Sequence, residues 1–188
     1  MLFRNASDGR TPAIRYLHLM LIATMTLAFA AGGIAFNFDV QMPIRLRDTL
    51  FNIHRLAGVF CICLVVTWGC LVLARSLRSG IRMKMPTALG AYHVFLLVLA
   101  FLVPCLPWIA RALDGRWEEL YVLISPYNLV SHPTSQLTYW LLDKHKLLVE
   151  LLAFLLLGHI AGALYHAVVL KDGVWRGMFS RSETSRRD

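Results

Sequence analysis

The sequence predicts an all-α integral membrane protein, a bundle of four helices that cross the bilayer. Hydrophobic residues make up 57% of the 188 residues and charged residues only 16%, and the mean hydropathy is +0.58. This composition is typical of membrane proteins. Asp, Glu, Lys and Arg are absent from four windows: 16–38, 56–74, 85–110 and 151–170. As a helix, each window is long enough to cross about 30 Å of hydrocarbon.

From these windows we expect spans at roughly 14–38, 52–75, 87–110 and 143–170. Four spans leave little chain for a soluble domain, so residues 1–188 are expected to form a single transmembrane domain. Residues 111–142 are expected to form a loop with a short helix lying along the membrane surface. Trp and Tyr residues in this loop are typical of the headgroup region.

The distribution of charge predicts the orientation of the bundle. Basic residues gather before the first span, between the second and third spans, and after the fourth span: Arg4, Arg10, Arg15, Arg75, Arg78, Arg82, Lys84, Lys171, Arg176, Arg181, Arg186 and Arg187. These are alternate ends of the helices, which the positive-inside rule assigns to the cytoplasm. The other links mix both signs. We therefore expect both termini inside, contact with membrane lipid and no nucleic-acid partner, although the net charge is +8.

The first span carries His18 close to its cytoplasmic end. Its arginines, apolar run and Ala-Phe-Ala at 28–30 also describe a cleavable signal peptide. Because the uncharged run extends to Phe38, we expect a retained helix instead. Residues 30–33, Ala-Ala-Gly-Gly, offer a smooth patch where another helix or a flat ring can approach closely.

The second and third spans each carry a histidine at one end. His54 is expected to open the second span on the outer side, after a short polar link in which Pro43 resists helix continuation. His93 lies near the cytoplasmic end of the third span. Pro104 and Pro107 are expected to kink or close the outer end of that helix.

The last span places three histidines on nearly one helical face. His145, His159 and His166 are separated by intervals that amount to net rotations of only about 40° and 20°. Ser135 is expected to cap this helix. Ionisable side chains at membrane depth are costly, and they indicate a functional site.

Matching the depths of these histidines predicts two metal-binding pairs. His18 and His159 lie near the inner face, whereas His54 and His145 lie near the outer face, about 21 Å away along the last helix. Two imidazoles on one iron describe a bis-histidine haem in a helical bundle. We therefore expect an inner haem on His18 and His159 and an outer haem on His54 and His145.

The positions of the cysteines restrict the type of haem and the kind of metal site that the chain can form. Cys61, Cys63, Cys70 and Cys105 lie in the spans, and the Cys-x-x-Cys-His haem attachment sequence is absent from the chain. The haems are therefore expected to be b-type. Zinc and copper are disfavoured because no depth gathers mixed carboxylate or thiolate ligands. A haem-free protein with packing histidines is the remaining alternative.

Other residues are expected to line these haems. His93 and His166 also lie near the cytoplasmic side and are alternative inner ligands; we expect them rather to contact a propionate or a quinone or to transfer protons. Arg55 is expected either to meet a propionate or to reach towards the membrane surface. Gly58, one turn after His54, leaves room for a porphyrin face.

The chain resembles the bacterial cytochrome b561 family over nearly its whole length. The resemblance is carried by Arg-Tyr-Leu-His at His18, Ile-His-Arg-Leu-Ala-Gly at His54, Asp-Lys-His-Lys at His145, the segment from His93 to Pro104, and GHIAGALYHAVVLKDGVWRGM from Gly158 to Met178. It implies iron ligation by the same four histidines. The chain departs from residues common in the family at Gly90 and Lys146.

The resemblance implies a multi-pass protein of the bacterial inner membrane that exchanges electrons with the quinone pool. Superoxide:ubiquinone oxidoreductase activity is one implied chemistry, with ubiquinone as acceptor and an outer cationic funnel formed by Arg45, Arg47, Arg55, Arg111, Arg116, Lys144 and Lys146. Acidic residues in the same region weaken that funnel: Asp114, Glu118, Glu119 and Asp143. The alternative is an electron-transfer or anchor subunit of a larger dehydrogenase or hydrogenase, with a redox partner protein.

Overall fold

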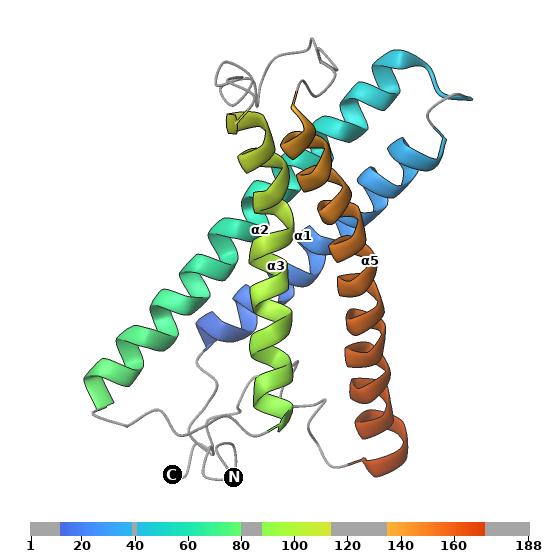
Figure 1. Ribbon diagram of the computed structural model, residues 1–188. Coiled ribbons are helices and arrows are strands. Elements are labelled where there is room, and N and C mark those ends of the chain that lie inside the picture. The colour runs from blue at the N-terminus through green and yellow to red at the C-terminus, as the bar shows by residue number, and fades with distance from the viewer. Residues whose placement is uncertain (1–11, 39–40, 80–87, 114–134, 172–188) are drawn as a thin grey trace, which may run out of the picture.

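The described part of the chain is entirely helical, which confirms the predicted fold class. The computed structural model describes residues 12–38, 41–79, 88–113 and 135–171. They form α1 (Pro12–Asn37), α2 (Ile44–Ser79), α3 (Ala88–Leu113), α5 (Gln136–Tyr165) and the short π-helix η2 (His166–Leu170), shown in Figure 1. Four helical segments are long and apolar enough to cross a membrane, with α5 and η2 counted as one.

Helix α2 begins well before the predicted start of its span. It starts at Ile44 rather than near residue 52, and it ends at Ser79 rather than near residue 75. The carbonyl of Pro43 accepts hydrogen bonds from the backbone N–H groups of Leu46 (2.9 Å) and Arg47 (3.1 Å). Pro43 therefore separates α1 from α2 and then starts α2, since proline is tolerated at a helix start. As a result, Arg45, Arg47 and Asp48 belong to a helix and not to a link.

Helix α3 continues through both of its prolines to Leu113. The expectation that Pro104 and Pro107 close the helix is therefore wrong. Neighbouring helices can satisfy the backbone groups that a proline frees, which is why prolines are tolerated in transmembrane helices. Residues 111–113 consequently belong to α3 and not to the outer loop.

Helix α5 starts at Gln136, earlier than the predicted residue 143, and the predicted cap is confirmed. The side chain of Ser135 accepts a hydrogen bond from the N–H of Thr138 (3.1 Å). The buried hydroxyl of Thr138 in turn donates to the carbonyl of Ala110 (3.3 Å), near the end of α3. The short surface helix predicted within 111–142 falls on residues 114–134, which lie outside the described residues.

Neighbouring helices in the chain pack against one another: α1 against α2, α2 against α3, and α3 against α5. In Figure 1, α1 and α2 slant across the view, whereas α3 and α5 stand more upright. A cluster of buried residues at Leu96, Leu99, Val103 and Leu152 joins α3 to α5, with Met25 and Phe29 of α1 packed against it. This cluster joins the helices that carry His18, His145 and His159.

Candidate functional site

His54 of α2 and His145 of α5 face each other across the bundle. Their ring centroids are 6.2 Å apart, and the ring planes are inclined by 76°. Both rings are half-buried. The two residues are far apart in the chain, so the fold brings them together at one depth, as the matching of depths predicts.

Each ring of this pair is anchored at Nδ1 by a backbone carbonyl of a different helix. His54 Nδ1 lies 2.8 Å from the carbonyl oxygen of Ala28 in α1, and His145 Nδ1 lies 2.9 Å from that of Val103 in α3. A carbonyl oxygen only accepts hydrogen bonds, so each Nδ1 carries the proton. The lone pair of each ring is then on Nε2, the nitrogen left to bind a metal.

Gly32 makes room for the His54 ring against α1. A Cβ atom at this position would lie 2.5 Å from His54 Nδ1 and 2.8 Å from Cε1. Any larger residue would therefore push the ring away from α1 and from the carbonyl of Ala28. Within the predicted patch at 30–33, Gly32 is therefore the glycine that the His54 ring approaches. A Cβ at Gly33 would meet nothing within 4 Å.

Gly58 lies against α3. A Cβ atom there would contact the Cβ of Pro104 at 3.4 Å. The glycine thus permits the close packing of α2 on α3. Its expected role beside a porphyrin face stays a prediction.

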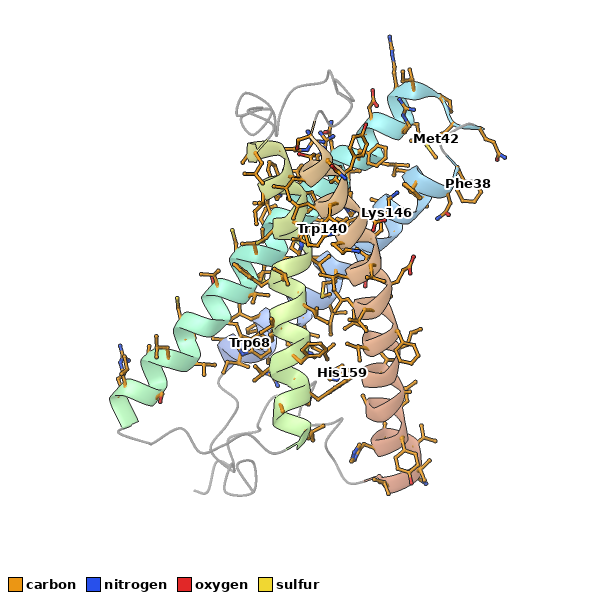
Figure 2. All side chains as sticks on the ribbon, in the orientation of Figure 1. Phe38, Met42, Trp68, Trp140, Lys146 and His159 are labelled. Atoms are coloured by element: carbon orange, nitrogen blue, oxygen red, sulfur yellow. The ribbon has the colours of Figure 1, made fainter. Side chains whose placement is uncertain are left out.

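His18 of α1 and His159 of α5 form a second facing pair in the other half of the bundle. Their ring centroids are 6.3 Å apart and their planes are inclined by 78°. This geometry is nearly the same as that of the first pair. In Figure 2, His159 and Trp68 lie in the lower half of the view, while Lys146 and Trp140 lie in the upper half.

Aromatic rings border the second pair. Trp68 of α2 lies 6.1 Å from the His18 ring, and Tyr92 of α3 lies 6.3 Å from the His159 ring, as measured between centroids. The Tyr92 hydroxyl donates to the carbonyl of Leu155 and so ties α3 to α5. The sequence pattern did not identify Tyr92 or Trp68, because aromatic residues are ordinary components of apolar spans.

His93 lies closer to His159 than His18 does. The centroids of His93 and His159 are 5.1 Å apart, with planes at 89°. The Nδ1 of His93 donates to the carbonyl of Leu89 on its own helix (2.7 Å), and the residue is exposed. His93 is thus a third ring at this depth, in agreement with its predicted place near the inner pair.

The other predicted residues lie on the same helices. His166 is the first residue of the π-helix η2, and its ring lies 6.3 Å from that of Tyr165. Arg55 is half-buried next to His54 on α2.

The ring spacings fit haem iron with two axial imidazoles. Imidazole nitrogens bind first-row metals at about 2 Å, and the ring centre lies about 1 Å beyond the nitrogen, so two rings on opposite sides of one ion have centroids about 6 Å apart. Both pairs have this spacing. Among the described residues, no group of three or more His, Cys, Asp or Glu side chains is arranged to hold a metal ion. Two histidines suffice for haem, because the porphyrin supplies the other ligands.

The predicted cationic funnel is only partly described. Lys146 follows His145 and extends over the ring of Phe36 at the end of α1, with Nζ 4.5 Å from the ring centroid. Lys144 lies 3.4 Å from the carboxylate of Asp143 and 5.6 Å from the Trp140 ring centroid. One of the lysines is therefore partly neutralised. Arg116, Asp114, Glu118 and Glu119 lie outside the described residues.

Comparison with known protein families gives a match over most of the chain. The family model described as "Prokaryotic cytochrome b561" matches residues 10–181 of the chain. No curated protein and no solved structure matches it. The matched residues include all four long helices and every histidine of the two pairs.

Proposed function

The chain belongs to the prokaryotic cytochrome b561 family, whose members are membrane haem b electron-transfer proteins, and we propose that it carries electrons between two haems and the quinone pool. His18 and His159 would hold one haem b, and His54 and His145 the other. The observation that carries this assignment is the spacing of the two pairs, 6.3 Å and 6.2 Å between ring centroids. Both values leave room for one metal ion that would be held by the two imidazoles of a pair.

When bound, haem would supply one-electron oxidation and reduction at iron, while the residues of the chain would orient its ligands and shield it from water. The carbonyls of Ala28 and Val103 accept the Nδ1 protons of the pair formed by His54 and His145. Such hydrogen bonds fix the ring orientation and raise the basicity of the ligating nitrogen. Buried leucine and valine side chains between the two depths exclude water from the path between the haems.

The topology proposed from the charge distribution places the pairs near opposite faces of the bacterial inner membrane. The excess of Lys and Arg at alternate ends supports an inner position for His18 and His159 and an outer position for His54 and His145. Their separation along α5 corresponds to about 21 Å of helix. Electrons would therefore cross most of the bilayer between the two pairs.

We assign the quinone site to the half that contains His18 and His159. His93 is exposed and lies 5.1 Å from His159, so its ring can both meet a ligand entering from the lipid and approach the haem ligand. Because its Nδ1 proton is held by the carbonyl of Leu89, His93 would donate to a quinone oxygen from Nε2 in its protonated form and deliver that proton. His166, further along α5 and η2, is the second candidate for proton delivery.

The donor we propose is superoxide on the outer side. Two superoxide anions each lose one electron and become O₂, while one ubiquinone takes up the two electrons and two protons and becomes ubiquinol. Lys146 and Arg45 lie at the end of the bundle that contains His54 and His145 and would attract the anion. Asp143, beside Lys144, reduces this attraction.

A test of this proposal uses the purified protein under a steady enzymatic flux of superoxide. We expect the absorption of reduced haem b to appear and then to decay when ubiquinone is added, with formation of ubiquinol. Superoxide dismutase should abolish the reduction. Haem that stays oxidised under superoxide, together with a soluble subunit that co-purifies and reduces it, would contradict the enzyme and support the alternative of an anchor subunit.

A further inference from the structure

The carbonyl that holds His145 belongs to a position where the backbone of α3 is interrupted. In an α-helix, the N–H of residue i bonds the carbonyl of residue i−4. Proline has no N–H, so Pro107 removes the bond that would otherwise reach the carbonyl of Val103. This is the same carbonyl that lies 2.9 Å from His145 Nδ1.

The place of Val103 makes that interruption costly unless it is compensated. Val103 is only 6% exposed and belongs to the buried cluster shared by α3 and α5. A buried carbonyl without a donor is unfavourable, and more so in a bilayer, where water is not available. The Nδ1 proton of His145 supplies the donor. The carbonyl of Val103 and the Nδ1–H group of His145 therefore satisfy each other's hydrogen-bonding capacity.

We propose that Pro107 is a positioning residue for His145. It frees the carbonyl of Val103 from the helix, and that carbonyl then fixes the proton on Nδ1 and directs Nε2 towards the metal position. The inference rests on the proposed role of His145 as a haem ligand. It adds a residue whose effect on the histidine is exerted through the backbone carbonyl of Val103.

The neighbouring proline does not share this role. Pro104 removes the bond to the carbonyl of Ala100, whereas the acceptor for His145 is Val103. The Cβ of Pro104 lies near Gly58 and serves the packing of α2 on α3. The two prolines sit on one helix, three residues apart, so Pro104 is a matched control for Pro107.

His54 obtains its carbonyl in a different way. Its acceptor, Ala28, lies four residues before Gly32, and Gly32 has an N–H that can make the ordinary helical bond. His54 thus shares the carbonyl of Ala28 with the N–H of Gly32. His145 instead supplies the carbonyl of Val103 with the donor that Pro107 lacks. We expect the hydrogen bond of His145 to be the stronger of the two and to contribute more to the stability of the ferric state of the haem that both histidines would hold.

Redox titration of the purified, haem-loaded protein tests the inference. In Pro107→Ala the restored N–H competes for the carbonyl of Val103, which weakens the bond to Nδ1 and makes His145 a poorer donor to iron. We expect both haems to be retained, the midpoint potential of one to shift upward and the low-spin EPR signal of the same haem to change. Pro104→Ala should leave both potentials in place.

A backbone ester separates the effect of the N–H from that of the proline ring. Replacing Pro107 by the α-hydroxy acid analogue of alanine removes the ring but adds no N–H, and it should keep the wild-type potentials. Unchanged potentials and EPR signals in Pro107→Ala, or the same shift in Pro104→Ala, would overturn the inference while leaving the haem assignment intact. A wild-type protein that binds no haem would overturn both.

Discussion

The two histidine pairs have almost the same ring spacing but different surroundings. His54 and His145 are each held at Nδ1 by a carbonyl of a neighbouring helix, and Gly32 gives His54 the space to approach α1. Around His18 and His159 lie three further rings: Trp68, Tyr92 and the exposed His93.

This difference separates two tasks within one bundle. Backbone carbonyls do not titrate, and the helix holds them in place. The hydrogen bonds to the carbonyls of Ala28 and Val103 therefore keep His54 and His145 in a fixed geometry. A third imidazole beside His159 adds an exposed group that can exchange protons, which agrees with the quinone site proposed for this half. We therefore expect substitutions in the first half to change haem binding and substitutions around the second pair to change reactivity.

The largest effect should come from filling the space beside His54. In Gly32→Ala the new Cβ would lie 2.5 Å from His54 Nδ1, so the ring must leave its position and lose the carbonyl of Ala28. We expect haem per protein, measured by the pyridine haemochrome method, to fall from two towards one. Gly33→Ala is the control, because a Cβ there meets nothing within 4 Å. An equal haem content in both variants would contradict the role of Gly32 in holding His54 in position for haem binding.

A smaller effect is expected from His93→Gln. The two haems should be retained, since His18 and His159 remain, while reoxidation of the reduced protein by ubiquinone should slow by about 100-fold, the low end of what a positioned proton donor contributes, because Gln can donate a hydrogen bond but cannot deliver a proton. Stopped-flow spectroscopy measures this rate. Loss of one haem would instead show that His93, which lies 5.1 Å from His159, is the ligand in place of His18 or His159.

The smallest effect should follow Tyr92→Phe. The ring beside His159 is kept, but the hydroxyl that bonds the carbonyl of Leu155 is removed. We expect a loss of about 0.6–1 kcal/mol in the free energy of unfolding, typical of one hydrogen bond within a membrane bundle, and no loss of haem. Denaturant unfolding in detergent micelles gives the first value and the haem spectrum gives the second. A haem content that falls to one would assign Tyr92 a direct part in cofactor binding.

The four spans and the pairing of histidines were predictable because each depends on one-dimensional information. Uncharged length identifies a span, and the direction of each helix gives the depth of His18, His54, His145 and His159. Helix ends were less predictable. Charged residues mark the edge of the hydrocarbon but do not end a helix, so α2 extends to Ile44 and includes Arg45.

The supports of the histidines could not be predicted from the sequence, because they are backbone atoms. Any residue has a carbonyl, and nothing in the side chains of Ala28 or Val103 distinguishes them as acceptors. Pro107 carries the relevant information in its missing N–H, but the sequence pattern indicated only a kink or helix end. The partner of the freed carbonyl becomes visible once α3 and α5 are packed together.

The central claim is that two histidine pairs hold two haems, and haem stoichiometry tests it most directly. Wild-type protein should contain two haem b per chain with two midpoint potentials. His145→Ala should retain one haem, with the potential that belongs to His18 and His159, and His18→Ala should retain the other. Two haems in His145→Ala would contradict the pair of His54 and His145, and a wild-type protein without haem would contradict the whole assignment.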